Sequence, residues 1–352
     1  MQLQRIYLII LVYSQKVDTN VKLIFRRMKK IVCIGGGTGT YQVLSGLKKL
    51  PVDLSAVISM CDSGGSTGKL RQELGILPPG DVRRAILALS DLPFAHKTLE
   101  DVFNFRFNGK NGNMKGGLAG HSLGNILLAA LVQITGSMDK AISEAARILN
   151  ASGNIYPVTL DKTNLVAILD DGTKVWGETK IDMRDFNLKH AIKNVYLTPK
   201  AKVFKDAALA ISNADLIVLG PGDLYTSIVP TLLVSGVNEA IANSKGKIVY
   251  ISNLMTKRGE TDGFNVGDFV SVIESYLGSS KDKLGYVLVN KRMGGQKAKI
   301  DKWYQRYGSK PVLNDLKKNV NFKVIEKDFM DSTTFYRHDP EKIAKTLMNI
   351  LE

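Results

Sequence analysis

The polarity pattern alternates between short apolar runs and longer segments with helical periodicity. Residues 31–34 form an apolar run, and the segment 41–50, which follows a glycine-rich stretch, has apolar positions at helical spacing. A second apolar run at 54–60 again ends in a polar, glycine-rich stretch, and a helical segment follows at 69–74. Repetition of strand, loop and helix in this order is typical of a parallel sheet.

The second half of the chain repeats this order and adds one segment of different texture. Apolar runs at 216–219, 247–252 and 286–290 have the length and composition of buried strands. Between about 155 and 192, alternating segments flank the sequence Asp-Asp-Gly at 170–172, which is a strong hairpin signal. The pattern predicts an α/β fold: a Rossmann-like, mostly parallel sheet flanked by helices, with a small β-hairpin insertion.

The first 27 residues differ from the rest of the chain. Their apolar run at 6–13 is too short to span a bilayer, and residues 16–27 lack the small-residue pattern of a secretory cleavage site. Met28 opens the first strand segment in the manner typical of an α/β protein. We therefore expect a cytoplasmic protein without a membrane span, with 1–27 as a non-native or disordered extension and 28–352 as a single α/β domain.

Cysteine and histidine usage narrows the chemistry. The only cysteines, Cys33 and Cys61, stand in apolar runs, and the four histidines form no close cluster with Cys and Asp along the sequence. A disulfide framework or a permanent transition-metal centre therefore lacks its ligands. The sequence identifies no particular cofactor, and the metal that fits it best is Mg²⁺ carried with a phosphorylated ligand.

The basic charge favours anionic ligands. The formal net charge is +15 and the isoelectric point about 9.6. Lysines are scattered along the whole chain, however, and no helix-turn-helix, RNA-binding or zinc-finger pattern is present. The charge therefore favours phosphorylated small ligands over specific nucleic-acid binding.

The glycine-rich loop after the first expected strand is a candidate phosphate site. Ligands of open parallel sheets bind at the carboxyl ends of strands, where loops meet helix N-termini with free N–H groups. No Walker A lysine follows the loop, and Thr at position 40 breaks the strict dinucleotide fingerprint, so a purely structural turn is the alternative. The candidate ligand contacts are Gly35, Gly36, Gly37, Thr38 and Gly39.

Two further loops strengthen this hypothesis. The second loop, residues 62–68, combines hydroxyl and N–H donors with Asp62, a candidate metal ligand. The third loop, residues 220–227, follows the apolar run at 216–219. A solvated turn is the alternative for the second loop, and Tyr225 of the third either stacks on a base or sugar or is an ordinary buried aromatic. The candidate contacts here are Ser63, Gly64, Gly65, Ser66, Thr67, Arg71, Gly220, Gly222 and Tyr225.

Polar residues at two expected helix starts complete this set. Asp81 and Arg84 begin one helix, where arginine can bind phosphate with two donors and the acid complements the helix dipole. His121 and Asn125 precede the apolar helix expected at 126–134. Helix capping is the alternative role for these residues.

Six motifs occur in order along the chain, and together they resemble the CofD-like family. The resemblance covers about residues 28–350 and is strongest to the YvcK-type branch, the gluconeogenesis factors. The motifs are Gly-Gly-Gly-Thr-Gly at 35–39, Asp-Ser-Gly-Gly-Ser-Thr-Gly-Lys-Leu-Arg at 62–71, Pro-Pro-Gly-Asp-Val-Arg-Arg at 78–84, Gly-His-Ser-Leu-Gly-Asn at 120–125, Leu-Gly-Pro-Gly-Asp-Leu-Tyr-Thr-Ser at 219–227 and Asn-Leu-Met-Thr at 253–256.

This resemblance implies a nucleotide ligand and leaves two functions open. CofD proteins are 2-phospho-L-lactate transferases, which move a phospholactyl group from a guanylyl-activated donor to a deazaflavin hydroxyl with Mg²⁺. YvcK-type proteins bind UDP-sugars such as UDP-N-acetylglucosamine and support carbon metabolism and cell-wall morphogenesis. We therefore expect a nucleotide diphosphate or UDP-sugar as the partner, with a homodimer left open.

The resemblance also assigns roles to single residues. Arg337 is similar to the arginine of the C-terminal Arg-His-Asp in the YvcK-type branch, and Tyr304 is similar to a tyrosine that this branch uses near its nucleotide-sugar. Asn253, in the Asn-Leu-Met-Thr motif, is a further candidate ligand contact, and Asp62 would be the catalytic acid and metal ligand of a transferase. Ser63 stands where the family carries a second acid, which favours a UDP-sugar binder over a transferase. An NAD-dependent oxidoreductase, indicated by the first loop alone, is the weakest alternative.

Overall fold

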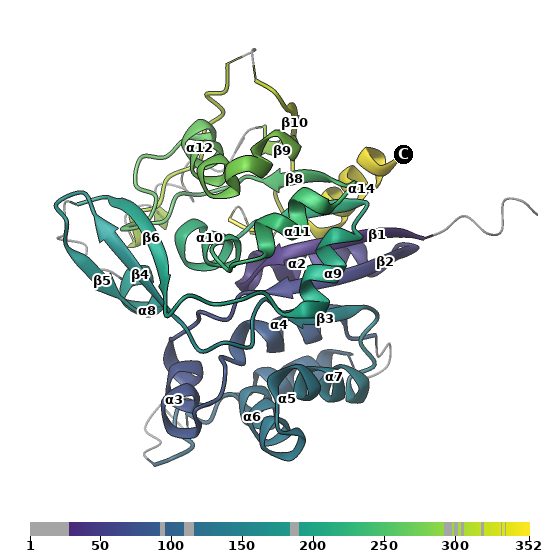
Figure 1. Ribbon diagram of the computed structural model, residues 1–352, viewed down its shortest axis with the longest axis vertical. Coiled ribbons are helices and arrows are strands. Elements are labelled where there is room, and N and C mark those ends of the chain that lie inside the picture. The colour runs from purple at the N-terminus through teal and green to yellow at the C-terminus, as the bar shows by residue number, and fades with distance from the viewer. Residues whose placement is uncertain are drawn as a thin grey trace, which may run out of the picture.

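A large parallel sheet and a small antiparallel sheet form the framework of the protein. The computed structural model describes residues 28–91, 96–108, 116–183, 190–291, 298, 302–303, 306–317, 320–331, 333–334 and 336–352. Helices flank the seven-stranded sheet of this part of the chain, and the three-stranded sheet lies to one side (Figure 1). The predicted Rossmann-like α/β fold is thereby confirmed.

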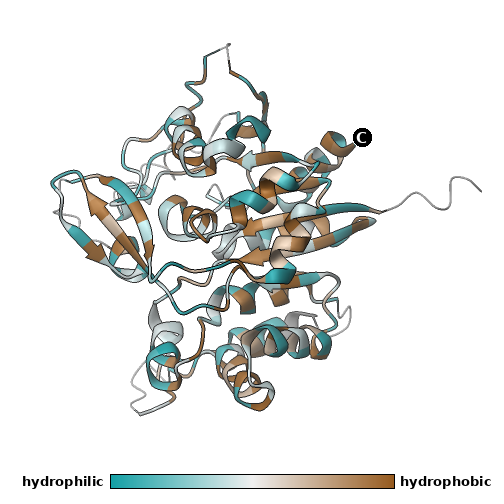
Figure 2. Ribbon diagram, viewed as in Figure 1, coloured by the Kyte–Doolittle hydropathy of each residue, from teal (hydrophilic) through white to brown (hydrophobic). Residues whose placement is uncertain are grey.

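The large sheet contains parallel strands in the order β10-β9-β8-β7-β1-β2-β3. Helices on both faces bury its central strands, so all four residues of β7 are buried and read as a continuous apolar run. Figure 2 shows these strands largely in brown, whereas the helices carry both colours. The strands are β1 (Lys29–Gly35), β2 (Val52–Ile58), β3 (Asn154–Pro157), β7 (Leu216–Leu219), β8 (Lys247–Ile251), β9 (Leu284–Asn290) and β10 (Lys323–Lys327).

The strand order reverses between β1 and β7. From β1 the chain proceeds to β2 and β3 on one side, and from β7 to β8, β9 and β10 on the other. Parallel crossovers are right-handed, so the connecting helices lie on opposite faces and the loops after β1 and β7 diverge. Ligands of such sheets bind at this switch point. Here it brings residues 36–39 next to residues 220–223.

Helices cover both faces of the large sheet. Helices α2, α4 and α14 pack together on one face, and α9 and α11 pack together on the other. The helical elements around the sheet are α2 (Gly37–Leu47), α3 (Gly65–Leu74), α4 (Gly80–Leu89), α9 (Lys205–Ser212), the π-helical turn η3 (Leu224–Ile228), α10 (Val229–Leu232), α11 (Val237–Asn243), α12 (Val266–Leu277), the 3₁₀ segment η4 (Gly278–Lys283) and α14 (Pro340–Leu351).

A further helical layer, α5 (His96–Asn104), α6 (Leu123–Thr135) and α7 (Met138–Ile148), packs beyond α4. The hydroxyl of Ser122 caps α6 by accepting the Asn125 N–H at 3.3 Å. The start of α6, and with it Asn125, is thereby fixed beside the second glycine-rich loop. No helix in the described ranges is both long and apolar enough to cross a lipid bilayer.

The small sheet has the order β5-β4-β6 and follows β3 in the chain. It contains β4 (Asn164–Leu169), β5 (Lys174–Trp176) and β6 (Ile192–Thr198), and the short helix α8 (Glu178–Asp182) lies between β5 and β6. The insertion predicted at about 155–192 differs at both ends. Its first residues belong to β3, which pairs with β2 in the large sheet, and β6 extends the small sheet to Thr198.

Candidate functional site

A hollow of about 530 Å³ lies at the switch point of the large sheet. We call it the first hollow. It is formed by the three glycine-rich loops, the start of α4, the start of α6 and helix α8. It brings together most of the residues predicted from the loops: Gly36, Gly37, Thr38, Gly39, Asp62, Gly64, Gly65, Ser66, Thr67, Asp81, Arg84, Asn125 and Gly222.

A second hollow, of about 320 Å³, adjoins the first. The two share a wall, which consists of Thr38, Gly39, Gly222 and Asp223. Two predicted residues, Asn253 and Arg337, line the second hollow. They stand there with Lys257, Trp303, Tyr336 and His338. The combined space is of the size that small-molecule ligands occupy in proteins.

Asp81 holds the first glycine-rich loop in place. Its carboxylate accepts the N–H of Gly37 at the start of α2, where the helix dipole favours an anion, and it pairs with Arg84 Nη1 at 2.8 Å. A Cβ atom on Gly36 would lie only 2.3 Å from Asp81 Oδ2, so this close approach requires glycine. Burial raises the pKa of Asp81 to about 6, although Arg84 lowers it. One N–H of the loop is therefore already occupied by a carboxylate.

The shared wall is rigid because the first and third loops interlock. A Cβ atom on Gly39 would lie 2.1 Å from the carbonyl oxygen of Pro221, so backbone meets backbone there. Asn253 Nδ2 donates to the carbonyl of Gly222 at 2.9 Å and fixes the other side of the wall. The two hollows therefore keep a defined relative position.

A buried polar network supports the second loop from behind. Asn125 accepts Arg83 Nε at 3.0 Å and donates to Ser66 Oγ at 3.1 Å. His121 Nδ1 lies 3.0 Å from the same Ser66 hydroxyl. Asn125 and Arg83 line the first hollow, whereas His121 lies behind Ser66 and positions its hydroxyl.

The structure places an acid next to Ser63. The Ser63 N–H donates to Glu178 Oε2 at 3.1 Å, and its hydroxyl lies 3.0 Å from Thr179 Oγ1. Glu178 and Thr179 belong to α8, the short helix between β5 and β6, and they line the first hollow together with Asp62. Burial, followed by the charge of Asp62, raises the pKa of Glu178 to about 7. A distant segment thus supplies a carboxylate beside the position where the resemblance implied that one was missing.

Three acids converge where the two hollows meet. Oxygens of Asp182, Asp223 and Glu260 lie within 4.8 Å of one another, and we call these residues the junction triad. The Lys257 ammonium contacts Asp182 Oδ1, lies 2.7 Å from Asp223 Oδ2 and lies 3.9 Å from Glu260 Oε2. The Glu260 side chain is fully buried and also accepts the N–H of Tyr225 at 2.5 Å.

Other predicted residues lie outside both linings. Arg71 turns away, since its guanidinium donates to the carbonyl of Thr163 and, at 2.9 Å, to Asn164 Oδ1, which ties α3 to β4. Tyr225 is 4% exposed and packs in the core. Gly35 and Gly220 shape the strand ends, and both have positive φ angles.

The second hollow has an aromatic wall. The rings of Trp303 and Tyr336 are stacked, with centroids 4.2 Å apart and planes at 20°. The guanidinium of Arg337 lies 5.6 Å from the Tyr336 ring centroid. Tyr304 lies outside the described residues, and its neighbour Trp303 provides an aromatic face at this place.

Sequence reasoning missed several charged residues of the site, among them Lys257, Glu260, Glu178, Asp182, Asp223 and Arg106. Lys257 directly follows the Asn-Leu-Met-Thr motif at 253–256 and Glu260 is the fourth residue after it, so extending that motif would have found both. Glu178 and Asp182 carry no such signal, because only the folding of the small sheet brings α8 to the glycine-rich loops.

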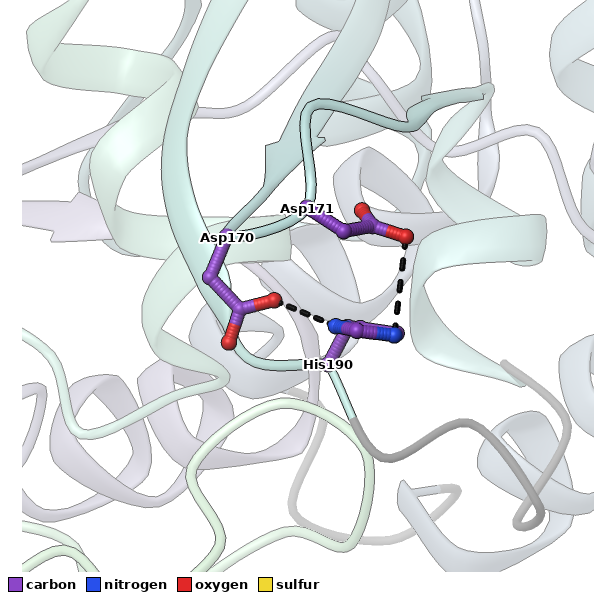
Figure 3. A group of neighbouring side chains, drawn as sticks. All are labelled: Asp170, Asp171 and His190. Carbon is purple, nitrogen blue, oxygen red and sulfur yellow. Dashed lines mark hydrogen bonds and ion pairs between the residues drawn. The ribbon is translucent and has the colours of Figure 1, made fainter.

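A second acidic group lies outside the hollows, on the small sheet. His190 Nδ1 lies 2.7 Å from Asp170 Oδ1, and His190 Nε2 lies 3.6 Å from Asp171 Oδ2 (Figure 3). All three residues are exposed to solvent. We call this set the turn group, because both acids belong to the hairpin turn after β4.

Known proteins are similar to this chain in both sequence and fold. The family model of 2-phospho-L-lactate transferase CofD matches residues 31–330. The gluconeogenesis factor of Bacillus subtilis is 38% identical over 327 residues, which covers 92% of this chain and 98% of the relative. The gluconeogenesis factor of Halalkalibacterium halodurans is 45% identical over 253 residues, or 72% and 75% of the two chains. A crystal structure of a UPF0052 family member from Bacillus halodurans is 38% identical, with a TM-score of 0.83 over 92% of this chain and 99% of that one. The chain therefore belongs to the CofD family.

Proposed function

We propose that this protein binds a nucleotide-sugar, of the UDP-N-acetylglucosamine kind, across the two joined hollows. In this proposal it acts in the cytoplasm as a gluconeogenesis factor, in carbon metabolism and cell-wall morphogenesis. The observation that carries the proposal is the shared wall between a polar hollow built from glycine-rich loops and a hollow with an aromatic face. A nucleotide-sugar has the matching parts: a flat base, a diphosphate and a polar sugar.

The second hollow suits the nucleoside end of such a ligand. The stacked rings of Trp303 and Tyr336 offer a flat apolar surface, and bases stack favourably on aromatic rings. Arg337 stands beside them with a guanidinium that can bind a diphosphate through two parallel hydrogen bonds. Asn253 is held by Gly222 and stiffens this side of the wall.

The first hollow suits the sugar and its phosphate. Ser66, Thr67 and Asn125 present hydroxyl and amide groups that bind sugar hydroxyls, and Arg84 presents a charge for phosphate. The carboxylates of Asp62 and Glu178 can accept hydrogen bonds from sugar hydroxyls. The names of the gluconeogenesis factors from Bacillus subtilis and Halalkalibacterium halodurans support the proposed role.

A second candidate function is Mg²⁺-dependent transfer of a phospholactyl group from a GDP-activated donor to an acceptor hydroxyl. The observation that favours it is the cluster of carboxylates in the first hollow, since Glu178 now stands beside Asp62 and near Asp81. These hard oxygen donors fit Mg²⁺, which would neutralise charge on the donor diphosphate. Asp62 and Asp81 would hold the ion in this case, and Glu178 would accept the proton of the acceptor hydroxyl.

Thermal unfolding with candidate ligands tests the first function. A ligand that binds only the folded state raises its melting temperature, so UDP-N-acetylglucosamine should raise it and NAD should not. GDP and GTP, measured at the same concentrations, distinguish the preferred base. Equal shifts with NAD and the UDP-sugar would contradict the proposal.

Asp62→Asn separates the two functions. If the protein only binds a nucleotide-sugar and acts as a sensor of it, the substitution changes the affinity for that ligand, and no catalytic activity is lost. In a metal-assisted transferase, the substitution abolishes turnover with a modest loss of binding. We expect the sensor result. Phospholactyl transfer to a deazaflavin by the parent protein, eliminated in Asp62→Asn, would establish the second function instead.

A further inference from the structure

The ammonium group of Lys257 occupies a position between three carboxylates that a divalent cation could fill. We propose that Lys257 is the resident cation of the junction between the two hollows and binds the anionic part of the ligand there in place of a metal ion. This inference rests on the proposed function, because it assigns a residue to the diphosphate of the nucleotide-sugar.

The geometry of the junction triad resembles that of a metal site. Opposite oxygen ligands lie about 4.2 Å apart around Mg²⁺ and about 4.8 Å apart around Ca²⁺, which is twice the usual metal–oxygen distance. The oxygens of Asp182, Asp223 and Glu260 lie within 4.8 Å of one another, the spacing that Ca²⁺ allows. They come from three separate segments, namely α8, the loop after β7 and the loop after β8. Their charges repel one another unless a cation lies between them.

Lys257 provides that cation from within the chain. Its ammonium pairs with all three acids, and Glu260, the fully buried member, also accepts hydrogen bonds from Tyr225 and Thr226. One ammonium group thus serves three carboxyl groups. A chain-borne cation is present at full occupancy whatever the concentration of free metal ions.

The position of Lys257 connects it to the ligand. Lys257 lines the second hollow, its partner Asp182 lines the first, and Asp223 belongs to the wall that both share. A diphosphate that passes from one hollow to the other therefore meets Asp223, which repels it, and Lys257, which attracts it. An ammonium group has three N–H donors, and within the described part of the chain Lys257 donates two hydrogen bonds, to Asp182 and Asp223. We expect the third donor to bind a phosphate oxygen.

Metal rescue tests this role. Titration with UDP in EDTA should show that the parent protein binds without a divalent ion, whereas Lys257→Met binds at least about tenfold more weakly, as expected for loss of one charge-assisted contact. Mn²⁺ should restore much of the affinity of Lys257→Met, because the ion then takes the vacated position. Lys283→Met is the matched control, since Lys283 is also partly buried but bonds to the carbonyl of Ser244 away from the hollows.

Counting bound Mn²⁺ by electron paramagnetic resonance, without any nucleotide, tests the same claim separately. Lys257→Met should bind one more Mn²⁺ per chain than the parent, and the double variant Lys257→Met/Glu260→Gln should lose that ion. Manganese held elsewhere, for example at Asp62, contributes equally to all three proteins. If Lys257→Met folds poorly, Mn²⁺ should raise its melting temperature more than that of the parent.

Each outcome decides the inference. A Lys257→Met protein that binds UDP in EDTA as tightly as the parent overturns it. So does a Lys257→Met protein that gains neither an extra Mn²⁺ nor any additional thermal stabilisation by Mn²⁺. If the parent does not bind UDP at all, the nucleotide-sugar proposal fails, and the manganese count still decides whether Lys257 stands in for a metal ion.

Discussion

The junction triad and the turn group have similar composition, and they differ most clearly at Glu260, whose side chain is fully buried, whereas all three residues of the turn group are exposed. Each brings three side chains with at least two carboxylates within reach of one cation. In the turn group of Figure 3, hydrogen bonds from His190 lower the pKa of Asp170, and those from Thr173 lower the pKa of Asp171. In the junction triad, burial raises the pKa values of Asp223 and Glu260.

This difference indicates where in the folded protein the ionised form of a carboxyl group is destabilised. Exposed acids keep water as a partner, so local hydrogen bonds stabilise their charged form. Buried acids lose that water, and each additional carboxylate makes ionisation more costly. The acids with raised pKa values therefore gather at the site: Asp81, Glu178 and Asp223 line the hollows, and Glu260 lies 3.9 Å from the ammonium of Lys257. A cation or a ligand there relieves the cost of ionisation.

The largest expected effect concerns the buried acid of the junction. Glu260→Ala leaves the buried Tyr225 N–H without its acceptor, whereas Lys257 keeps Asp182 and Asp223, so the free energy of unfolding should fall by about 1–3 kcal/mol, as for other buried donors left unpaired. Chemical denaturation measures it. Glu239→Ala, in an exposed glutamate of α11, is the control and should change little. A loss below about 1 kcal/mol for Glu260→Ala would contradict a structural role for the junction triad.

A smaller effect concerns pH and Glu178. Its carboxyl titrates near pH 4.5 in the unfolded chain but near 7 in the folded chain, so between these values the folded chain binds more protons. The free energy of unfolding therefore falls as pH rises from about 4.5 to 7. Glu178→Gln should remove about 1–2 kcal/mol of that decrease, allowing for solvent screening of a half-buried group. Denaturation curves at pH 5 and pH 7.5 measure it, and an unchanged pH dependence would show that Glu178 titrates normally.

The smallest effect belongs to the turn group. Asp171→Asn removes a charge that surface contacts with Thr173 and His190 stabilise, so the unfolding midpoint at pH 7 should not change measurably. The folded pKa of Asp171 lies below its unfolded value, so the small stabilisation it gives is present above about pH 4 and is lost in acid. A midpoint shift at pH 7 comparable to that of Glu260→Ala would contradict the expectation that the turn group contributes less to stability than the junction triad.

Local sequence patterns predicted the framework well because burial on both faces leaves a continuous apolar run. Strand β7 is the clearest case, since all its residues are buried. Strand β10 gives no such signal, because it is an edge strand with polar ends and no fully buried residue. Most strands can be recognised in the sequence but their order cannot, so the switch point became visible only in the structure.

The site was predicted where single loops determine it and missed where the fold assembles it. The glycine-rich loops at 35–39 and 62–68 carry their geometry in their own residues. Glu178 lies 115 residues from its partner Ser63, and no local pattern connects them. His121 and Tyr225 stand in the expected segments but point to Ser66 and the core, because packing decides which way a side chain faces.

Calorimetric titration of UDP-N-acetylglucosamine into the parent protein, Arg337→Ala and Arg147→Ala tests the central claim most directly. Arg337 lines the second hollow beside the aromatic wall, whereas Arg147 is an exposed arginine of α7 paired with Glu144. If Arg337 holds the diphosphate, Arg337→Ala should lose about 1.5–3 kcal/mol, or about 10- to 100-fold, in affinity at unchanged melting temperature. Arg147→Ala should bind like the parent. Equal affinity of all three proteins, or no binding by the parent, would contradict the assignment of the joined hollows to a nucleotide-sugar.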